Sequence, residues 1–459
     1  MIPYCDSRTC VAAGCDPVVC TGAGMPLNLT MFERSTRVIP GGVNSSIRAF
    51  KAVGGRPYIV ARGKGAHVVD VQGRTYIDLV QSYGAIILGH AHPVVTEAIQ
   101  RAAGDGTSYG APTPREMKLA EAIRERVPSC ERVRFMNSGT EATSTAVRLA
   151  RGATGRSKVV IFDGNFHGAT DALLAAGGSG VATLGLPGTA GVPAEAVANT
   201  LVVPYNQVPE LDESVAAVIV EPVAANMGVI APAAGFLEGL RAACDRVGAL
   251  LVFDEVITGF RLGRGGAQGR FGVRPDLTCF GKVIGGGLPV GAVGGRREIM
   301  ENLSPLGSVF HAGTLAGNPL ATAAGLAALS VLTDEVYAEL EGRAERLASM
   351  LSEAGKSAGI PINVSRVGTL TGIHLGEELT GRKLVGEIPV DGPRLPVNFT
   401  EAKTTDEALF ARLFHALLRE GVAIAPGAYE ALFVGLAHDD AVLDELAGRI
   451  ERAARSVAD

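Results

Sequence analysis

Between residues 130 and 255, short apolar runs alternate with stretches of helical periodicity. The runs 158–162, 216–220 and 249–253 are almost continuously apolar, without the polar alternation of a half-exposed strand. Strands of a parallel sheet read this way because they are buried on both faces, and parallel neighbours need a crossover, usually a helix. The pattern predicts an α/β fold with a mainly parallel sheet covered by helices.

The chain has 459 residues, more than one hydrophobic core usually serves. We expect a leader over 1–30 and a large domain over 96–334. Residues 31–95 and 335–459 are expected to form one small α+β domain from both chain ends. Strands are expected at 57–60, 67–70 and 76–79, and helices near 94–104, 115–127, 235–246, 316–333 and 404–420.

Charge and hydropathy exclude several partners. The net charge is -5, from 42 basic and 47 acidic residues, and no basic run suggests nucleic acid. No apolar run reaches the roughly 18 residues that span a bilayer, so no membrane partner is expected. Cys130, Cys244 and Cys279 are scattered, as buried thiols are in a reducing compartment, which favours a cytoplasmic location.

The leader contains four cysteines spaced five residues apart, namely Cys5, Cys10, Cys15 and Cys20. This spacing does not match a zinc finger or ribbon. A disordered leader upstream of a start at Met25 or Met31 is favoured over a metal site, and no signal peptide is recognised.

Two polar residues interrupt the apolar pattern in a way that suggests covalent chemistry. Asp254 ends the apolar run 249–253, and Lys282 follows 28 residues later, before a run of glycines. A lysine held among apolar groups has a lowered pKa and becomes a nucleophile toward an aldehyde. Enzymes that use pyridoxal phosphate (PLP) need such an amine, and a carboxylate against the pyridine nitrogen. Either residue alone is more often structural, but the pair favours a PLP site.

Other segments carry features that a PLP site would use. Residues 137–142 join a strand to a helix, whose first N–H groups can bind a phosphate, although helix capping explains them too. Phe166 could stack on a cofactor ring or be core, and Thr314 could donate to a phosphate or belong to a turn. Arg48 could grip a substrate carboxylate or lie on the surface.

Together these segments resemble the class III (fold type I) aminotransferases from about residue 31 onward. Within that family they are most similar to the glutamate-1-semialdehyde 2,1-aminomutases. The segments that carry the resemblance are 41–50, 88–93, 106–113, 177–187, 221–228 and the glycine run around Lys282.

The resemblance implies PLP, or its aminated form PMP, as cofactor, held by Lys282 as a Schiff base. It implies a homodimer, because Thr314 would reach the phosphate from the partner subunit. The other implied cofactor-binding residues are Ser138, Gly139 and Thr140 at the phosphate, Phe166, His167 and Val256 at the ring, Asp254 at the ring nitrogen, and Glu221 and Asn226 near the 3-hydroxyl.

The resemblance also implies a substrate pocket. Arg48 with Ser45 would hold the substrate carboxylate, Glu430 would lie near its amine, and residues 168–193, including Ser179, would form a gating loop. The chain departs from the aminomutases here. They usually carry tryptophan at Tyr83, tyrosine at Phe166 and Phe310, and glutamine at His311, and this chain has no tryptophan.

Three functions remain open. The first is the mutase reaction, which converts glutamate 1-semialdehyde to 5-aminolevulinate. The second is an intermolecular aminotransferase for another carboxylate-bearing ketone or amino acid, such as a β-amino or ring-derived one, which the altered aromatic residues favour. The third is a PLP-fold regulator, which Lys282 and Asp254 oppose and which would need a basic DNA-binding domain.

Overall fold

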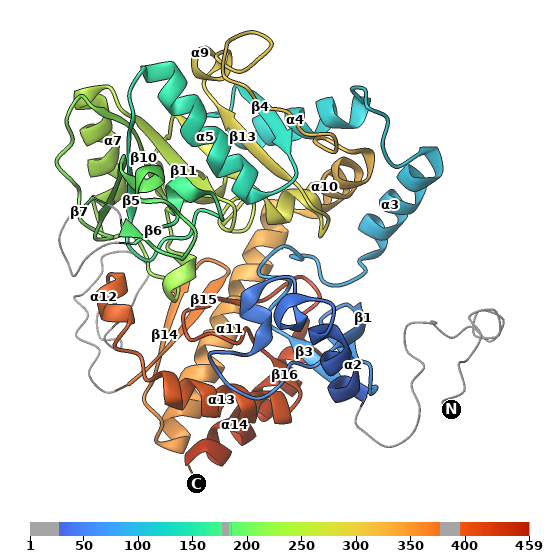
Figure 1. Cartoon of the computed structure of the whole chain (residues 1–459). Coiled ribbons are helices and arrows are strands. Elements are labelled where there is room, and N and C mark those ends of the chain that lie inside the picture. Colours follow the sequence, from blue (N-terminus) through green and yellow to red (C-terminus); the bar gives the residue numbers. More distant parts are fainter. Residues whose placement is uncertain (1–26, 177–182, 185, 377–394, 459) are drawn as a thin grey trace.

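The computed structural model describes residues 27–176, 183–184, 186–376 and 395–458 (Figure 1). Its largest sheet has eight strands in the order β4-β13-β12-β11-β10-β5-β9-β7. These strands are β4 (Arg132–Met136), β5 (Lys158–Phe162), β7 (Thr183–Leu184), β9 (Thr200–Val203), β10 (Val215–Val220), β11 (Leu250–Glu255), β12 (Leu277–Phe280) and β13 (Gly291–Gly295). A short pair, β6 (Ala175–Ala176) and β8 (Leu186–Pro187), lies apart.

The centre of this sheet is parallel, as predicted. β9, β5, β10, β11 and β12 run parallel, whereas β7 is antiparallel to β9, and β13 is antiparallel to both β12 and β4. The sequence analysis did not identify β13, because it has the sequence Gly-Ala-Val-Gly-Gly and glycine is a poor strand former. The predicted α/β fold with a mainly parallel sheet is confirmed.

Alternate residues of the central strands enter two separate cores. Val159, Ile161 and Ala217 pack with α5 (Gly139–Thr154) on one face. Val160 and Val218 pack on the other face with α7 (Phe236–Val247). This period-two division explains the continuous apolar runs, because both faces are covered.

The small domain joins the two chain ends, as the blue and red segments of Figure 1 show. Its first sheet has the order β1-β2-β3-β16 and its second β14-β15-β17. The strands are β1 (Val60–Lys64), β2 (His67–Asp70), β3 (Thr75–Asp78), β14 (Ile362–Val367), β15 (Leu370–Leu375), β16 (Val422–Ala423) and β17 (Leu432–Phe433). Val422 pairs with Ile77, which ties the C-terminal part to the N-terminal part.

The remaining helices are α2 (Leu27–Thr36), α3 (Pro93–Asp105), α4 (Pro114–Arg126), α6 (Ala194–Val197), α8 (Gly266–Phe271), α9 (Arg297–Met300), α10 (Pro319–Val331), α11 (Asp334–Ala358), α12 (Phe399–Ala402), α13 (Glu407–Arg419) and α14 (Asp440–Ala458). The long helix α11 runs from the large domain to the small one (Figure 1). Leu340 packs in a core that contains Leu119 of α4, and Leu347 packs in a core that contains Leu413 of α13.

Two boundaries predicted from the sequence are wrong. The leader does not extend to residue 30, because α2 begins at Leu27. The expected strand at 57–60 begins only at Val60, where pairing with Asp70 starts. Cys130, Cys244 and Cys279 are buried free thiols, as expected, whereas the leader cysteines lie outside the described residues.

Within the described ranges, no single helix is long and apolar enough to cross a membrane; one bent pair, α10 with α11, passes on length and composition only. In the same ranges, no three His, Cys, Asp or Glu residues are grouped as a metal site would need.

Candidate active site

One cavity, of about 580 Å³, collects most of the residues singled out in the sequence. It lies where β10, β11 and β12 end, beside the start of α5 and against segments of the small domain. The predicted residues that line it are Ser45, Arg48, Tyr83, Gly139, Thr140, Phe166, His167, Glu221, Asn226, Asp254, Val256, Lys282 and Glu430. The carboxyl ends of parallel strands are where α/β folds place their ligands.

Asp254 and His167 form a buried pair on the floor of the cavity. Asp254 Oδ2 lies 2.7 Å from His167 Nδ1, and Asp254 Oδ1 accepts the backbone N–H of Val256 at 3.1 Å. The two side chains are 4% and 1% exposed, so the histidine orients the carboxylate away from water. His167 was predicted to bind the cofactor, but its contact with Asp254 was not, because the two residues are far apart in the sequence.

Lys282 follows β12 directly, in the short 3-10 turn Lys282–Gly285. Its backbone is left-handed (φ 47°), and Nζ donates to the backbone carbonyl of Tyr83 at 2.9 Å. Burial lowers the pKa of Lys282, and Glu430, Glu221 and Asp254 oppose that shift. A lowered pKa increases the neutral, nucleophilic fraction of the amine.

The start of α5 forms a cradle beside this amine. Ser138 caps the helix, since its Oγ accepts the N–H of Glu141 at 3.2 Å. Thr140 Oγ1 accepts the N–H of Ala169 at 3.3 Å. A Cβ on Gly168 would lie 2.5 Å from that same oxygen, so the loop can approach the helix only with glycine there. Exposed N–H groups at the start of a long helix suit a phosphate.

Glu221 fixes the loop that carries Phe166. Its Oε1 accepts the N–H of Phe166 at 2.7 Å, and its Oε2 accepts the N–H of Ala225 at 3.1 Å. Asn226 Nδ2 donates to both oxygens at 3.0 Å. Burial raises the pKa of Glu221 to about 7, against the opposing effect of His167. Phe166 is 56% exposed, so its ring is available to cover a flat ligand.

The same cavity is lined by the expected substrate-binding residues Ser45, Arg48, Tyr83 and Glu430. Arg48 lies in the 3-10 turn Ser46–Ala49, and its side chain forms no hydrogen bond or ion pair with any residue that the structure describes. Burial raises the pKa of Glu430, and Lys282 opposes the shift. Burial, together with Glu430, raises the pKa of Tyr83 to about 12, so its hydroxyl stays protonated.

The remaining predicted residues lie outside this cavity. Phe310 is 69% exposed, and Thr314 and His311 follow on the same surface segment. Ser179 lies outside the described residues. The segment 310–314 therefore does not line the cavity of its own chain.

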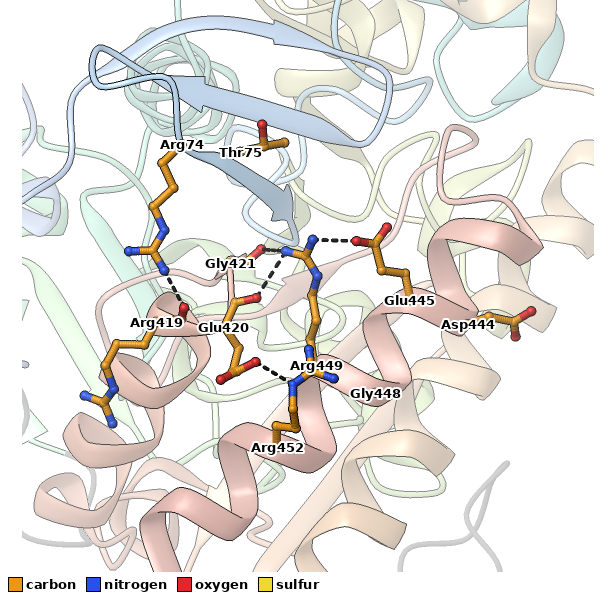
Figure 2. A pocket seen from close by; sticks show the side chains of 10 residues that line it. All are labelled: Arg74, Thr75, Arg419, Glu420, Gly421, Asp444, Glu445, Gly448, Arg449 and Arg452. Carbon is orange, nitrogen blue, oxygen red and sulfur yellow. Dashed lines mark hydrogen bonds and ion pairs between the residues drawn. The ribbon is translucent and has the colours of Figure 1, made fainter.

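A second cavity, of about 540 Å³, lies between β3, α13 and α14 (Figure 2). Its arginines are largely paired. Arg452 binds Glu420 at 2.7 Å, Arg449 binds Glu445 and two backbone carbonyls, and Arg74 binds backbone carbonyls of α13. Nothing in it resembles a nucleophile beside a carboxylate, so it is not a candidate active site.

The fold and the first cavity define a PLP-dependent enzyme of the aminotransferase type. The sequence model of the family "Aminotransferase class-III" matches residues 50–453, and the chain belongs to this family. The unpaired Nε2 of His167, the cradle at α5 and the buried Lys282 amine fit the family's cofactor.

Three known proteins illustrate the similarity. The glutamate-1-semialdehyde 2,1-aminomutase of Bordetella avium is 49% identical over 437 residues, covering 94% of this chain and 99% of its own. An omega-transaminase from Sphaerobacter thermophilus superposes with a TM-score of 0.84 at 34% identity, and the match covers 94% of this chain and 97% of the transaminase. A glutamate-1-semialdehyde aminomutase from Pseudomonas aeruginosa, solved with PMP, has a TM-score of 0.80 at 25% identity, covering 93% of each chain.

Proposed function

We propose that this protein is a PLP-dependent glutamate-1-semialdehyde 2,1-aminomutase, which forms 5-aminolevulinate. The observation that carries the proposal is a cavity whose lining includes Lys282, the Asp254–His167 pair and Arg48, whose side chain has no partner among the described residues. The 49% identity to an aminomutase over nearly the whole chain supports the choice of substrate.

Each residue has a task in this reaction. The cofactor supplies an aldehyde that bonds to amines and a ring that withdraws electrons from the attached carbon. Asp254 keeps the ring nitrogen protonated, and His167 holds Asp254 in place. Lys282, whose pKa burial lowers, moves a proton at the carbon next to the substrate nitrogen.

Other residues that line the cavity bind the substrate. Arg48, with Ser45, binds the substrate carboxylate by charge-assisted hydrogen bonds. Glu430 accepts a proton from the substrate amine, and Tyr83 closes the side of the cavity toward the small domain. The diamine formed between the two half-reactions must stay in the site until it has returned an amine to the cofactor.

The test loads the purified enzyme with PMP and supplies glutamate 1-semialdehyde without any other amino donor. A mutase regenerates its own amine, so many molecules of 5-aminolevulinate per active site are expected. A single turnover, or none, would overturn the proposal. Arg48→Ala is expected to raise KM strongly while leaving cofactor binding intact, because Arg48 acts on the substrate.

An intermolecular aminotransferase is the second candidate. The replacement of aromatic and amide groups at Tyr83, Phe166, Phe310 and His311 favours it. The similarity to the omega-transaminase, with a TM-score of 0.84 at 34% identity, favours it too. Its substrate would be another carboxylate-bearing ketone or amino acid. In the same assay it would turn over once and then require an added amino donor.

We also propose that the enzyme is a cytoplasmic homodimer with shared active sites. The segment 306–315 exposes three large apolar side chains, with Leu306 75%, Phe310 69% and Leu315 51% accessible. Covering such a surface with a second copy of the chain would bring Thr314, Phe310 and His311 to the partner's cavity.

A further inference from the structure

Arg261 is a completely buried cation, with 0% of its side chain exposed. Within the described residues no carboxylate forms an ion pair with it, and burial lowers its pKa. Burying an unpaired charge is unfavourable, because the charge loses its hydration. A residue kept under such a cost has a task, and neither the proposed chemistry nor the sequence pattern assigned one to Arg261.

The hydrogen bonds of Arg261 join two segments that wall the active cavity. Its Nη2 and Nε donate to the carbonyl of Gly84 at 2.9 and 3.3 Å, and its Nη1 donates to the carbonyl of Val434 at 3.2 Å. The guanidinium also lies over the ring of Phe433, 5.1 Å from its centroid. Phe433 lines the cavity, and Gly84 follows Tyr83, which lines it too.

The first of these segments has an unusual backbone. Gln81, Ser82 and Tyr83 have φ angles of 44°, 52° and 56°, and Gly84 follows at 90°. Left-handed backbone is strained at a non-glycine residue, so the turn persists only where its surroundings hold it. A Cβ on Gly84 would lie 2.7 Å from Phe433 and 3.3 Å from Arg261 Nε, so the turn is packed directly against the guanidinium.

This turn determines where the reactive amine lies, because the Tyr83 carbonyl accepts Lys282 Nζ at 2.9 Å. Arg261 also acts on Lys282 through its charge. Burial is the main cause that lowers the pKa of Lys282, Glu430, Glu221 and Asp254 raise it, and the charge of Arg261 adds a smaller lowering effect. Burial lowers the pKa of Arg261 itself to about 9, so the guanidinium remains charged at neutral pH.

We infer that Arg261 is a positioning residue of the active site: its buried guanidinium ties the turn 81–84, and with it the carbonyl that holds Lys282 Nζ, to Phe433 and Val434. This inference rests on the proposed role of Lys282 as the reacting amine. It does not depend on which substrate the enzyme uses.

The test measures the ionisation of Lys282 in the full-length apoenzyme. Competitive acylation across a pH series, read by mass spectrometry of the peptide that contains Lys282, gives the pH midpoint for this amine. In Arg261→Met, which keeps the stem but removes the charge, the midpoint is expected to rise by about one pH unit. An unchanged midpoint would overturn the inference.

Arg264→Met is the matched control, because Arg264 lies three residues further along the chain and pairs with Glu125 on the surface at 2.7 Å. Its midpoint is expected to equal that of the wild type, and an equal rise in this control would also overturn the inference.

If Arg261→Met does not fold, Arg261→Gln takes its place, since the amide can still donate to Gly84, and the same rise is expected. In the holoenzyme, the pH titration of the cofactor's visible absorption should move in the same direction. Failure of the mutase assay would leave these measurements unaffected, so the two proposals fail separately.

Discussion

Lys282 has the environment that a reactive amine requires. Burial lowers the pKa of its amine, and the carboxylates of Glu430, Glu221 and Asp254 raise it. The effect of burial is the largest, so the pKa is lowered. An amine whose neutral and charged forms are favoured by opposing neighbours suits a group that must both release and accept a proton.

Lys282→Ala should abolish covalent attachment of the cofactor. Activity is expected to fall by roughly a hundred- to ten-thousandfold, because nucleophile and proton carrier are lost together. Borohydride reduction followed by mass spectrometry should find a cofactor adduct on the wild type and none on the variant. Lys158→Ala, which removes a surface lysine near Asp212, should behave as the wild type. An adduct that persists in Lys282→Ala would refute the assignment.

Asp254→Asn tests the role of the buried pair without changing its volume. The amide oxygen can still accept the N–H of Val256, so thermal unfolding should change little. The negative charge facing the ring nitrogen is lost, and kcat is expected to fall by roughly a hundredfold or more. Activity within a few-fold of the wild type would mean that Asp254 only supports His167.

At the scale of elements, a glycine with left-handed backbone lies at each end of α5. Gly155 ends the helix with φ 70° and open space around it. Gly168, with φ 84°, belongs to the loop that crosses the other end, where a side chain would collide with Thr140. A side chain at either position would therefore strain the left-handed backbone, but only a side chain at residue 168 would also disturb the phosphate cradle.

Gly168→Ala should weaken cofactor binding by roughly tenfold or more, because the loop must move away from the start of α5. Gly155→Ala is the matched variant, expected to lower stability by about 1 kcal/mol without changing cofactor affinity. Titration of the apoenzymes with PLP, alongside thermal unfolding, separates the two effects. Equal affinities in both variants would argue against the cradle.

The strand β15 carries a histidine that should make stability depend on pH. His374 is 1% exposed, and burial lowers its pKa to about 4. The unfolded chain binds the proton near pH 6.5, so the contribution of the neutral imidazole is complete above that pH and is lost as the pH falls toward 4. The loss for this residue is of order 3 kcal/mol.

His374→Gln removes this titration. Urea unfolding at pH 6.5 and pH 4.5 should show a smaller acid-induced loss of stability in the variant than in the wild type. His438, whose pKa burial also lowers to about 4, will keep part of the dependence in both proteins. An identical loss in the variant would show that His374 does not contribute. His67→Gln, at a position that is only half-buried, is the control.

At the scale of the whole molecule, the site gathers segments from nearly the entire chain. Arg48, Lys282 and Glu430 face one cavity although some 380 residues separate the first from the last. The antiparallel β1-β2-β3 unit and β16 bring the chain ends together, and α11 connects their core to the large domain.

The proposed dimer can be tested by complementation. If Thr314 acts across the interface, a mixed dimer of Lys282→Ala and Thr314→Ala chains contains one intact site. Random reassortment should then restore about a quarter of the wild-type activity, since half of the dimers are mixed and each has one working site. No recovery beyond the two parents would place Thr314 in its own chain's site. Analytical ultracentrifugation should find a dimer.

The sequence by itself determined the parallel α/β fold, because strands buried on both faces must be continuously apolar, and that signal is local. It also pointed to Lys282 and Asp254, since a charged residue beside an apolar strand or a glycine run is conspicuous in any fold. The cradle at 138–140 was recognisable for the same reason: a helix start has its own local pattern.

Only the tertiary structure decided which distant groups meet. The contact between His167 and Asp254, the loop held by Glu221, and the bridge from Arg261 to Gly84 and Val434 join residues separated by tens to hundreds of positions. No periodicity marks such contacts. The strand β13 was not predicted for a related reason. Its glycines are required because neighbours such as the Ser138 carbonyl lie close to Gly291, and only the folded chain brings these groups together.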